Sequence, residues 1–466
     1  MNHDLDRLDL LRAGALAGTV RLSLQAGLRE FPPEIYALAD TLEILDLSGN
    51  ALSELPAELP RLHRLRILFC SDNRFTELPE VLGRCAQLEM IGFKANRIGR
   101  VAAAALPPRL RWLILTDNEI ETLPDELGRC ERLQKLALAG NRLSALPATL
   151  ARCRRLELLR ISANRFTALP DWLATLPRLS WLAFGGNPLG EAAEQQALSA
   201  SPLPAIPWPT LQIGPRLGEG ASGVIYQARP LAGAERNADP GTDTPELALK
   251  VFKGAVTSDG WPHSEMAAAL RAGSHAGLIA LRGRLSEHPQ RAMGLAMVRI
   301  APRFRSLAAP PSLASCTRDV YADDARFAPQ LLLRLAQRMA AALAHLHRQG
   351  ILHGDFYAHN ILHDDDGQAY LADFGAASFL APSADAQGGE SASASAWALA
   401  LQRLEVRAFG CLLEELLARC TAPLPPEARP PLAGLHELAR ACLGEVPQQR
   451  PLFDAIEQRL SALAGA

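Results

Sequence analysis

The chain has 466 residues, which is enough for two or three domains that each bury a core of their own. Its composition, 48% hydrophobic and 21% charged, is that of a folded protein and excludes extended disorder as the main state. With 48 basic and 50 acidic residues the net charge is -2, which excludes bulk attraction to nucleic acid or to an anionic membrane. We therefore expect no nucleic-acid partner and no membrane partner.

The N-terminal segment, residues 1–19, carries acidic residues where a secretory signal would carry basic ones. No later run approaches the roughly 18 apolar residues that span a bilayer. We therefore expect a cytoplasmic protein in which residues 1–19 form an N-terminal cap. The eight cysteines include no CxxC pair, which favours buried thiols over metal or disulfide roles.

Residues 20–195 contain an internal repeat. Asparagines recur every 22 or 23 residues, and each closes the pattern LxxLxLxxN or a close apolar variant, as in "LEILDLSGN" and "LQKLALAGN". These asparagines are Asn50, Asn73, Asn96, Asn118, Asn141, Asn164 and Asn187. Three cysteines, Cys85, Cys130 and Cys153, each lie twelve residues after a repeat asparagine, where Leu62 and Leu176 stand in other units. These cysteines are expected to replace core leucines.

The pattern resembles the leucine-rich repeat family. That resemblance implies one curved solenoid, in which short strands form one edge and stacked leucines fill the interior. The residue six positions before each asparagine is expected on the concave strand surface: Ile44, Ile67, Met90, Trp112, Lys135, Leu158 and Trp181. Such an apolar and aromatic stripe is typical of a surface for a protein substrate or regulator, although side chains half covered by their neighbours explain it equally well.

The repeat period breaks in "SASPLPAIPWPT", where four prolines fall within eight residues. A stretch of this composition predicts a stiff, extended connection. We therefore place a Pro-rich linker at residues 196–209 and a second domain at residues 210–466.

The second domain opens with "LGEGASGVIYQA", in which Gly218, Gly220 and Gly223 have the spacing GxGxxGxV. Without Cβ atoms such a hairpin can lie close to phosphates and offer them backbone N–H groups, although glycine turns between strands are common. "LALK" then ends a predicted strand at Lys250, and Glu265 opens a predicted helix. A lysine steadied by a helix carboxylate can orient a triphosphate, whereas the same pair taken alone is an ordinary surface Lys and Glu.

Residues 330–349 predict an amphipathic helix, with Leu332, Leu335, Met339, Leu343 and Leu346 on one face. The helix leads into "ILHGDFYAHNIL". There Asp355 can accept a proton from an attacking hydroxyl, and Asn360 can bind a magnesium ion through its amide oxygen. "LADFGAAS" supplies Asp373 as a carboxylate for metals that bridge phosphates.

Taken in this order, these elements resemble a protein kinase, with an N-lobe at residues 210–300 and a C-lobe at residues 301–466. "EVRAFGCLLEELL" and "QQRPLFDAIEQRL" match two further motifs of that family. The fold class we expect is a multidomain chain, in which an α/β leucine-rich repeat solenoid precedes a bilobal α+β protein kinase-like domain.

The kinase resemblance implies ATP and Mg²⁺ as cofactors. It implies Asp355 as the base, Lys250 and Glu265 as a phosphate-orienting pair, and Asn360 and Asp373 as metal ligands. The ATP site that it implies comprises Leu217, Gly218, Gly220, Gly223, Val224, Ala248, Lys250 and Met297.

Two departures concern the catalytic loop. Gly354 stands where the family usually has Arg, so the cation that would hold a phosphorylated activation loop is missing, and switching by loop phosphorylation becomes doubtful. Tyr357 stands where serine/threonine-directed members have a Lys on the γ-phosphate, and His359 is a candidate to substitute for it in part.

Two further departures concern the segment that normally forms the platform for a peptide substrate. It lacks an "APE" match and puts Glu405 where the family has Asp. Glu390 is a weak candidate for the missing carboxylate that would pair with Arg450.

Three functional hypotheses follow. The first is an ATP-dependent protein kinase, directed at Ser/Thr, whose repeats bind a substrate or regulator. The second is a catalytically weak kinase-like scaffold that acts through its repeats. The third is a small-molecule phosphotransferase, because aminoglycoside and choline kinases carry HGDxxxxN. Suitable residues at every catalytic position favour a working enzyme, and the complete glycine loop, "DFG" and the C-terminal motifs favour the first hypothesis over the third.

Overall fold

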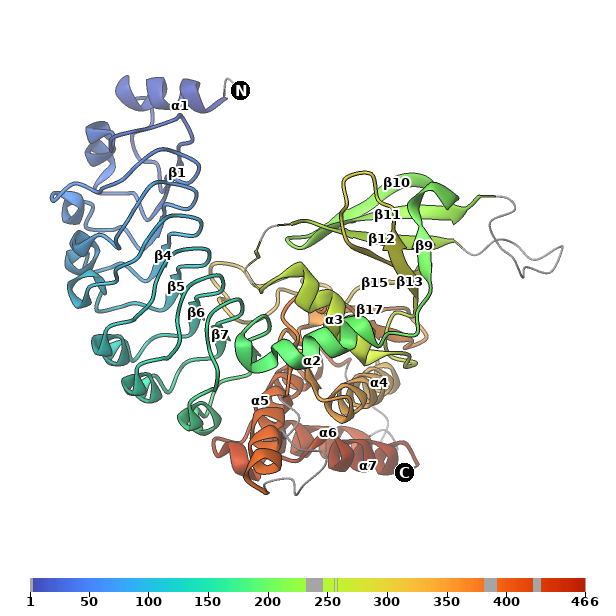
Figure 1. The fold of residues 1–466 in the computed structure, drawn as a ribbon. Helices are drawn as coiled ribbons and strands as arrows, with labels where there is room; N and C mark the ends of the chain where they lie inside the picture. Colours follow the sequence, from blue (N-terminus) through green and yellow to red (C-terminus); the bar gives the residue numbers. More distant parts are fainter. Residues whose placement is uncertain are drawn as a thin grey trace. The chain divides into compact units, whose positions relative to one another are not determined.

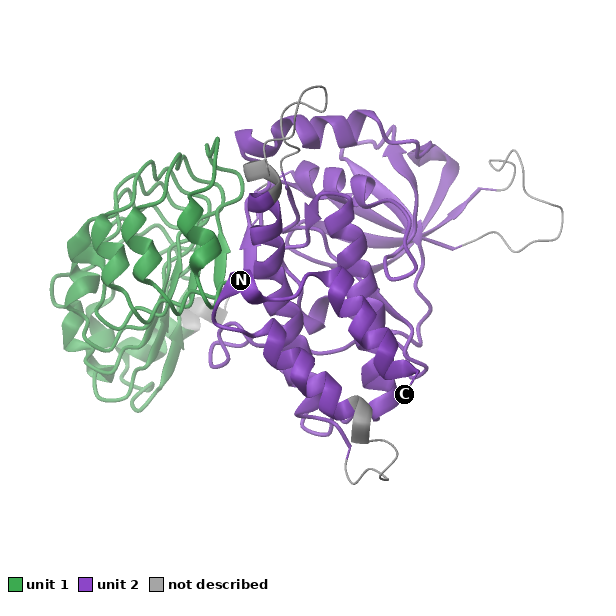
Figure 2. Ribbon diagram, turned by 90° about the horizontal axis from the view of Figure 1, so that it is seen from below, with its two compact units in different colours: residues 1–179 green, residues 180–466 purple. Residues whose placement is uncertain are grey.

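The computed structural model describes residues 3–231, 246–254, 256–257, 259–380, 392–421 and 429–465. The chain divides into two compact units, Met1–Leu179 and Ser180–Ala466, which Figure 2 shows in different colours. The division falls inside the last repeat. The strand of that repeat and the helix after it therefore belong to the second unit, although the sequence pattern assigns them to the solenoid.

The first unit is a ladder of short parallel strands that pair in chain order (Figure 1). Each strand residue lies beside the residue 22 or 23 positions later, which confirms the repeat period. The strands are β1 (Arg21–Ser23), β2 (Ile44–Asp46), β3 (Ile67–Phe69), β4 (Met90–Gly92), β5 (Trp112–Ile114), β6 (Lys135–Ala137) and β7 (Leu158–Arg160).

A single α-helix, α1 (His3–Arg12), precedes the first strand of the described ladder. The chain returns from each strand to the next through a short 3₁₀ helix. These are η1 (Pro33–Leu38), η2 (Leu59–Arg61), η3 (Glu80–Arg84), η4 (Ala103–Ala105), η5 (Asp125–Arg129), η6 (Ala148–Arg152) and η7 (Asp171–Thr175). The repeat leucines on both sides of these returns are buried and fill the interior of the ladder.

The repeat asparagines connect neighbouring repeats. Asn141 donates from Nδ2 to the carbonyls of Leu115 and Leu138, both at 2.9 Å, and accepts at Oδ1 from the N–H of Ile120 at 3.0 Å. The same pattern of bonds recurs at Asn118 and Asn164. Each asparagine thus satisfies buried backbone groups of its own repeat and of the one before, which makes the repeats depend on one another.

The cysteines that replace repeat leucines are buried, as predicted. Burial raises the pKa of Cys85 and Cys130 to about 11 and that of Cys153 to about 12. All eight cysteines lie within the described residues and are free thiols, and Cys420 is the one that is half-buried. These thiols behave as small apolar side chains of the core.

The expected concave stripe differs from one repeat to the next. Ile67, Met90 and Leu158 are buried, whereas Ile44, Trp112 and Lys135 are half-buried. The Lys135 ammonium lies 4.2 Å from the centroid of the Trp112 ring, a cation–π contact. The half-buried members, together with their neighbours on the strands, are what the first unit could offer to a partner, and a partner-binding role for this stripe stays a prediction.

The second unit begins with β8 (Trp181–Ala183) and α2 (Pro188–Ser199), and continues into a six-stranded sheet of order β10-β11-β12-β14-β13-β9. The strands are β9 (Ala205–Pro207), β10 (Leu211–Glu219), β11 (Gly223–Pro230), β12 (Leu247–Phe252), β13 (Leu281–Ser286) and β14 (Gly294–Val298), with η8 (Trp208–Thr210) after β9. The Pro-rich stretch predicted as a linker therefore contributes β9, which runs parallel to β13. The edge of a sheet tolerates prolines because they remove N–H groups that would not all be paired there.

Helices form most of the remaining second unit, together with short strands around the site (Figure 1). The helices are α3 (Pro262–Ala272), α4 (Pro329–Arg348), α5 (Ala392–Leu417), α6 (Arg429–Cys442) and α7 (Phe453–Ala464), with the 3₁₀ helices η9 (Ala358–Asn360) and η11 (Pro447–Gln449). The short strands are β15 (Arg305–Ser306), β16 (Ile351–Leu352), β17 (Ile361–His363), β18 (Ala369–Leu371) and β19 (Ser378–Phe379). Helix α4 confirms the predicted amphipathic helix, because the five apolar residues of its predicted face are buried. None of the described helices is long and apolar enough to cross a lipid bilayer.

We expect Asn141→Ala to lower the free energy of unfolding of the repeats by about 1–3 kcal/mol, because it leaves the buried N–H of Ile120 without its acceptor and removes one of the two hydrogen bonds at each of two buried carbonyls. Urea denaturation followed by circular dichroism measures the change. The control is Arg142→Ala, which removes an ion pair with Glu119 in which both side chains are 43% exposed, and should cost less than about 1 kcal/mol. An equal loss in the two variants would contradict the role given to the asparagine.

Candidate active site

Lys250, on β12, and Glu265, in the first turn of α3, form a buried ion pair. Their side chains are 13% and 5% exposed. Nζ of Lys250 also lies 3.8 Å from Oδ1 of Asp373. Burial on its own would lower the pKa of Lys250, but Asp373 and Glu265 outweigh it and raise that pKa above its ordinary value. The two carboxylates thus favour the charged form of Lys250 at the centre of this site.

The glycine-rich hairpin of β10 and β11 lies next to this lysine, with Ile225 opposite Lys250 in the strand register. A Cβ at Gly223 would lie 2.7 Å from the carbonyl oxygen of Val251, so a glycine is required for the hairpin to approach β12 so closely. By contrast, a Cβ at Gly218 or Gly220 would meet nothing within 4 Å. Both glycines border open space, and Gly220 does so beside the ion pair.

Asp355 and Asn360 are joined by direct hydrogen bonds. Nδ2 of Asn360 donates to Oδ2 of Asp355 at 2.8 Å and to the Asp355 carbonyl at 2.9 Å. The turn of η9 brings the two side chains together across five residues. The bonds fix the orientation of the carboxylate and assign the nitrogen side of the amide to Asp355, which leaves the amide oxygen for another partner.

Asp373 has a left-handed backbone, with φ of +61°. Few residues other than glycine adopt this region, and aspartate is one that does because its short side chain bonds locally. Here Oδ1 accepts a hydrogen bond from the N–H of Gly375 at 3.0 Å. The dense surroundings oppose ionisation, but Lys250 and this N–H outweigh them and lower the pKa of Asp373.

Most of these side chains line one cavity of about 280 Å³. Among the residues that line it are Gly220, Gly223, Lys250, Glu265, Met297, Asn360 and Asp373, all of them expected in the site from the sequence. The apolar side chains of Leu278, Leu295 and Phe374 also line it. Of the residues with predicted roles in transfer, Lys250, Glu265, Asn360 and Asp373 therefore line this cavity, whereas Asp355 does not line it and is connected to it through its hydrogen bond with Asn360.

Four residues expected at the ATP site do not line this cavity: Leu217, Gly218, Val224 and Ala248. Leu217 is 44% exposed, and Ala248 is buried in the sheet opposite Met297. Val224 faces a different groove, which Tyr226 and Phe252 also line. Because side chains alternate between the two faces of a strand, Ile225 lines the cavity in its place. The spacing GxGxxGxV already puts its apolar position at Ile225, so the signal for this residue was in the sequence.

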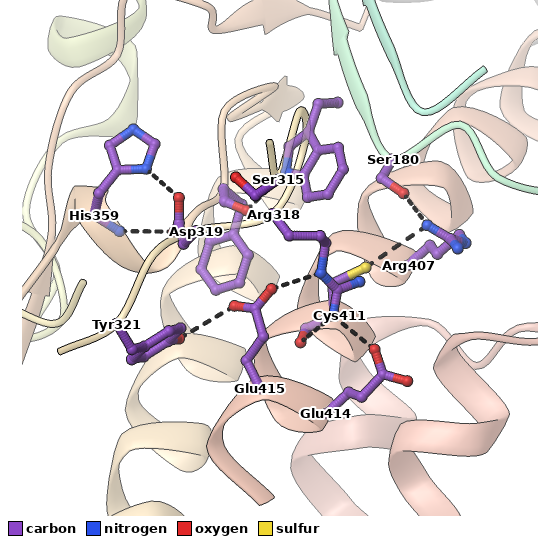
Figure 3. A network of polar contacts seen from close by, with 12 residues as sticks. Ser180, Ser315, Arg318, Asp319, Tyr321, His359, Arg407, Cys411, Glu414 and Glu415 are labelled. Atoms are coloured by element: carbon purple, nitrogen blue, oxygen red, sulfur yellow. Dashed lines mark hydrogen bonds and ion pairs between the residues drawn. The ribbon is translucent and has the colours of Figure 1, made fainter. Parts of the chain in front are cut away.

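His359 and Asp319 form a second polar pair at the cavity (Figure 3). Nδ1 of His359 lies 2.7 Å from Oδ1 of Asp319, and the His359 backbone N–H donates to Oδ2 at 3.0 Å. Burial opposes the charged imidazole, but the hydrogen bond and charge of Asp319 outweigh it and raise the pKa of His359. Asp319 belongs to no motif and lies 40 residues away in sequence, so sequence reasoning missed it.

The segment that carries Asp319 is held against α5 by its flanking residues (Figure 3). Arg318 donates from Nε to Oε1 of Glu415 at 2.6 Å, and the Tyr321 hydroxyl donates to Oε2 of the same carboxylate at 3.1 Å. Bonds on both sides of Asp319 limit its movement. The orientation of His359 is thus set by a network that extends to the helix α5.

Glu405 supports the loop before Asp355. Its Oε1 accepts from the N–H of Gly354 at 2.7 Å, and its Oε2 lies 2.8 Å from Nε2 of His347. The Glu405 side chain is 3% exposed. Burial opposes its ionisation, but the bonds to His347 and Gly354 outweigh burial and lower its pKa. A glutamate in place of the family's aspartate thus still reaches the catalytic loop.

Gly354 itself is required by its surroundings. Its φ is +72°, in the left-handed region, and a Cβ there would lie 2.5 Å from the carbonyl oxygen of Ala376 and 2.8 Å from that of Leu182 on β8. Any larger residue would collide with two backbone carbonyls. The glycine at this position therefore has a steric reason in this fold.

Arg450 is 2% exposed, and its partners include two backbone carbonyls: Nε donates to Gly444 at 2.9 Å and one terminal nitrogen to Arg403 at 3.2 Å. Burial, with a contribution from nearby Arg407, lowers its pKa to about 10. Glu390, its predicted partner, lies outside the described residues. That pairing stays a prediction.

Comparison with known proteins bears directly on this geometry. Residues 211–429 match the family described as protein tyrosine and serine/threonine kinase. Residues 41–62, 108–166 and 131–189 match leucine rich repeat families. This chain is a leucine-rich repeat protein with a C-terminal protein kinase domain. The kinase match covers the glycine hairpin, the ion pair, Asp355 and Asp373.

Two curated relatives resemble parts of this repeat kinase. The mitogen-activated protein kinase kinase kinase MCK1 of Pyricularia oryzae is 27% identical over 174 residues, which are 33% of this chain and 10% of the relative. The mitogen-activated protein kinase kinase kinase mkh1 of Cytospora mali is 42% identical over 64 residues, 14% of this chain and 3% of the relative. The chain thus spans at most a tenth of the length of these relatives.

One solved structure resembles the repeats. The leucine-rich repeat protein LIC12759 of Leptospira interrogans shares 29% sequence identity over 38% of this chain and 46% of its own, with a TM-score of 0.36. This likeness adds nothing to what the repeat pattern and the strand ladder already show.

We expect Glu405→Gln to destabilise the kinase domain at pH 7 by about 1–3 kcal/mol, because it removes a buried charge that two hydrogen bonds stabilise. The folded-state pKa of Glu405 is below its ordinary value of 4.5, so the ionised form contributes stability above about pH 4.5 and that contribution is lost as the pH falls through the folded-state pKa. The variant should therefore lose less stability on acidification than the wild type.

Urea denaturation between pH 3.5 and pH 7 measures this difference. The control is Glu414→Gln, whose carboxylate is 57% exposed in its ion pair with Arg318. The account of Glu405 fails if wild type and Glu405→Gln lose stability in parallel over this range.

Proposed function

We propose that this chain is an ATP- and Mg²⁺-dependent protein kinase, directed at Ser/Thr hydroxyls, whose repeats bind a substrate or regulator on their concave face. The observation that carries the proposal is the buried Lys250–Glu265 pair with Asp373 at 3.8 Å, in one cavity with Asn360. An arrangement of this kind is suited to orienting a highly charged ligand such as a triphosphate. A cytoplasmic location and the absence of nucleic-acid and membrane partners belong to the same proposal.

The residues present fit ATP and Mg²⁺. Asn360 and Asp373 provide an amide oxygen and a carboxylate, which are hard ligands of the kind that Mg²⁺ prefers, and this ion commonly completes its shell with water and phosphate oxygens. Gly220 lines the cavity and leaves open space in which backbone N–H groups can approach phosphates. When bound, ATP supplies the γ-phosphoryl group, and Mg²⁺ neutralises charge that develops on it.

The side chains of the chain then divide the work of positioning. Lys250, held by Glu265, binds phosphate oxygens as a fixed cation. Asp355 accepts the proton of the acceptor hydroxyl and aims its oxygen at the phosphorus, with its carboxylate oriented by Asn360. Catalysis of this type is mainly positioning and charge stabilisation, so the rigidity of the hydrogen-bonded pairs is what the reaction requires.

The proposed Ser/Thr direction is supported by the two curated relatives named as mitogen-activated protein kinase kinase kinases, which match 174 and 64 residues of this chain. Tyr357 replaces the phosphate-binding Lys of such kinases and is buried. We propose that His359 contributes the missing donor. Asp319 bonds to Nδ1 of His359, and because His359 lines the cavity, its other ring nitrogen, Nε2, is the candidate donor to phosphate.

The test is phosphate transfer from labelled ATP with Mg²⁺, comparing wild type with Asp355→Asn and Lys250→Met. We expect both variants to lose about 10²-fold or more in kcat, because each removes a group that acts only once the reacting atoms are in place. Mapping the labelled residues identifies the acceptor, and modified Ser or Thr hydroxyls would support the proposed direction. Equal phosphate transfer by all three proteins would exclude the proposed kinase activity.

A second variant tests His359. We expect His359→Ala to lower kcat about 10- to 100-fold, the loss typical of removing one donor to a reacting group, and His359→Lys to retain more activity than His359→Ala. The matched control is His363→Ala, a nearby buried histidine that does not line the cavity. Equal kcat values for His359→Ala and wild type would show that His359 contributes no donor.

A further inference from the structure

Helix α2, which follows the last repeat strand, packs along α3 within the second unit (Figure 1). Leu198 of α2 packs against an apolar cluster that includes Met266, Ala269 and Leu270 of α3. None of these α2 residues belongs to a kinase motif. The helix that carries Glu265 is therefore covered on one side by the segment that joins it to the repeats.

Glu194 is the polar centre of this packing. Glu194 is 4% exposed, and both of its carboxylate oxygens accept hydrogen bonds. Oε2 accepts from Oγ of Ser264 at 2.7 Å, and Oε1 accepts from the N–H of Gly186 at 2.7 Å. Ser264 is 3% exposed and directly precedes Glu265. A buried carboxylate is costly unless its oxygens are bonded, so these partners hold each other in place.

The segment that contains β8 and α2 also contacts two other parts of the site. Nε1 of Trp181 donates to the carbonyl of Phe356 at 2.9 Å, and its ring stacks on Tyr357 with centroids 4.3 Å apart and planes 6° apart. The N–H of Phe184 donates to Oγ of Ser378 at 2.8 Å. The segment therefore contacts the two residues that follow Asp355 and the strand that follows Asp373.

We propose that β8 and α2 form a built-in clamp of the kinase domain, and that Glu194 is a positioning residue that holds the first turn of α3 through Ser264, so that Glu265 stays against Lys250. The three parts that the clamp contacts, α3, the loop of Asp355 and the segment after Asp373, are those whose relative placement phosphoryl transfer requires. The kinetic consequence rests on the proposed kinase function, whereas the structural consequence for α3 does not.

The test uses the full-length chain and the variants Glu194→Ala and Ser264→Ala. Ser264→Ala removes one hydroxyl and leaves a good helix former, so it preserves the fold. We expect kcat for phosphate transfer to fall about tenfold in each, the size expected for loss of a hydrogen bond to a buried charge. The double variant should fall no further than the worse single variant, because both changes remove the same bond.

Two further variants separate positioning from general damage. Glu194→Gln keeps an acceptor oxygen and should retain most of the activity that Glu194→Ala loses. Glu191→Ala removes an exposed carboxylate from the same helix and should behave as wild type.

Hydrogen exchange supplies a readout that does not depend on catalysis. We expect faster exchange of the α3 amides in Glu194→Ala and Ser264→Ala, and not in Glu191→Ala. Unchanged α3 exchange in Ser264→Ala would overturn the clamp, whatever happens to kcat, and Ser264→Ala decides the question if Glu194→Ala does not fold. If wild type transfers no phosphate, the proposed function fails while faster α3 exchange still supports the clamp.

Discussion

The buried ion pair between Lys250 and Glu265 is the interaction on which the site in the second unit depends. Two charges removed from water are tolerated only in good geometry, and loss of one partner leaves the other stranded. The strand β12 and the helix α3 must therefore keep a fixed separation. The sheet sets the position of the first, and α3 is held by packing against its neighbours, including α2.

Much of this arrangement could be predicted from the sequence, because regular spacing and ordered motifs record it. The asparagine period predicts the strand ladder, and its register matches. The order of Gly218, Lys250, Asp355 and Asp373 predicts a shared site. Lys250 and Asp373 do lie 3.8 Å apart at one cavity, whereas Gly218 and Asp355 do not line it. The sequence records such features wherever a residue must stand at a fixed spacing from other residues of a repeat or motif.

The rest depends on contacts between residues far apart in sequence, which no local pattern records. The repeat signature continues to Asn187, so nothing near Trp181 indicates that its ring stacks on Tyr357. In the same way, Asp319 has no motif to connect it with His359. Gly354 was recognised as a departure from the family, but its cause lies in the carbonyls of Ala376 and Leu182, which meet it only in the folded chain. A cationic switch residue has no room at that position.

The most direct test of the central claim is a crystal structure of the chain with a non-hydrolysable ATP analogue and Mg²⁺. The account predicts one Mg²⁺ bound by oxygens of both Asn360 and Asp373 at about 2.0–2.1 Å, with the Lys250–Glu265 pair intact and Lys250 against the phosphates. A nucleotide bound elsewhere, or a metal ion that contacts neither Asn360 nor Asp373, would contradict it.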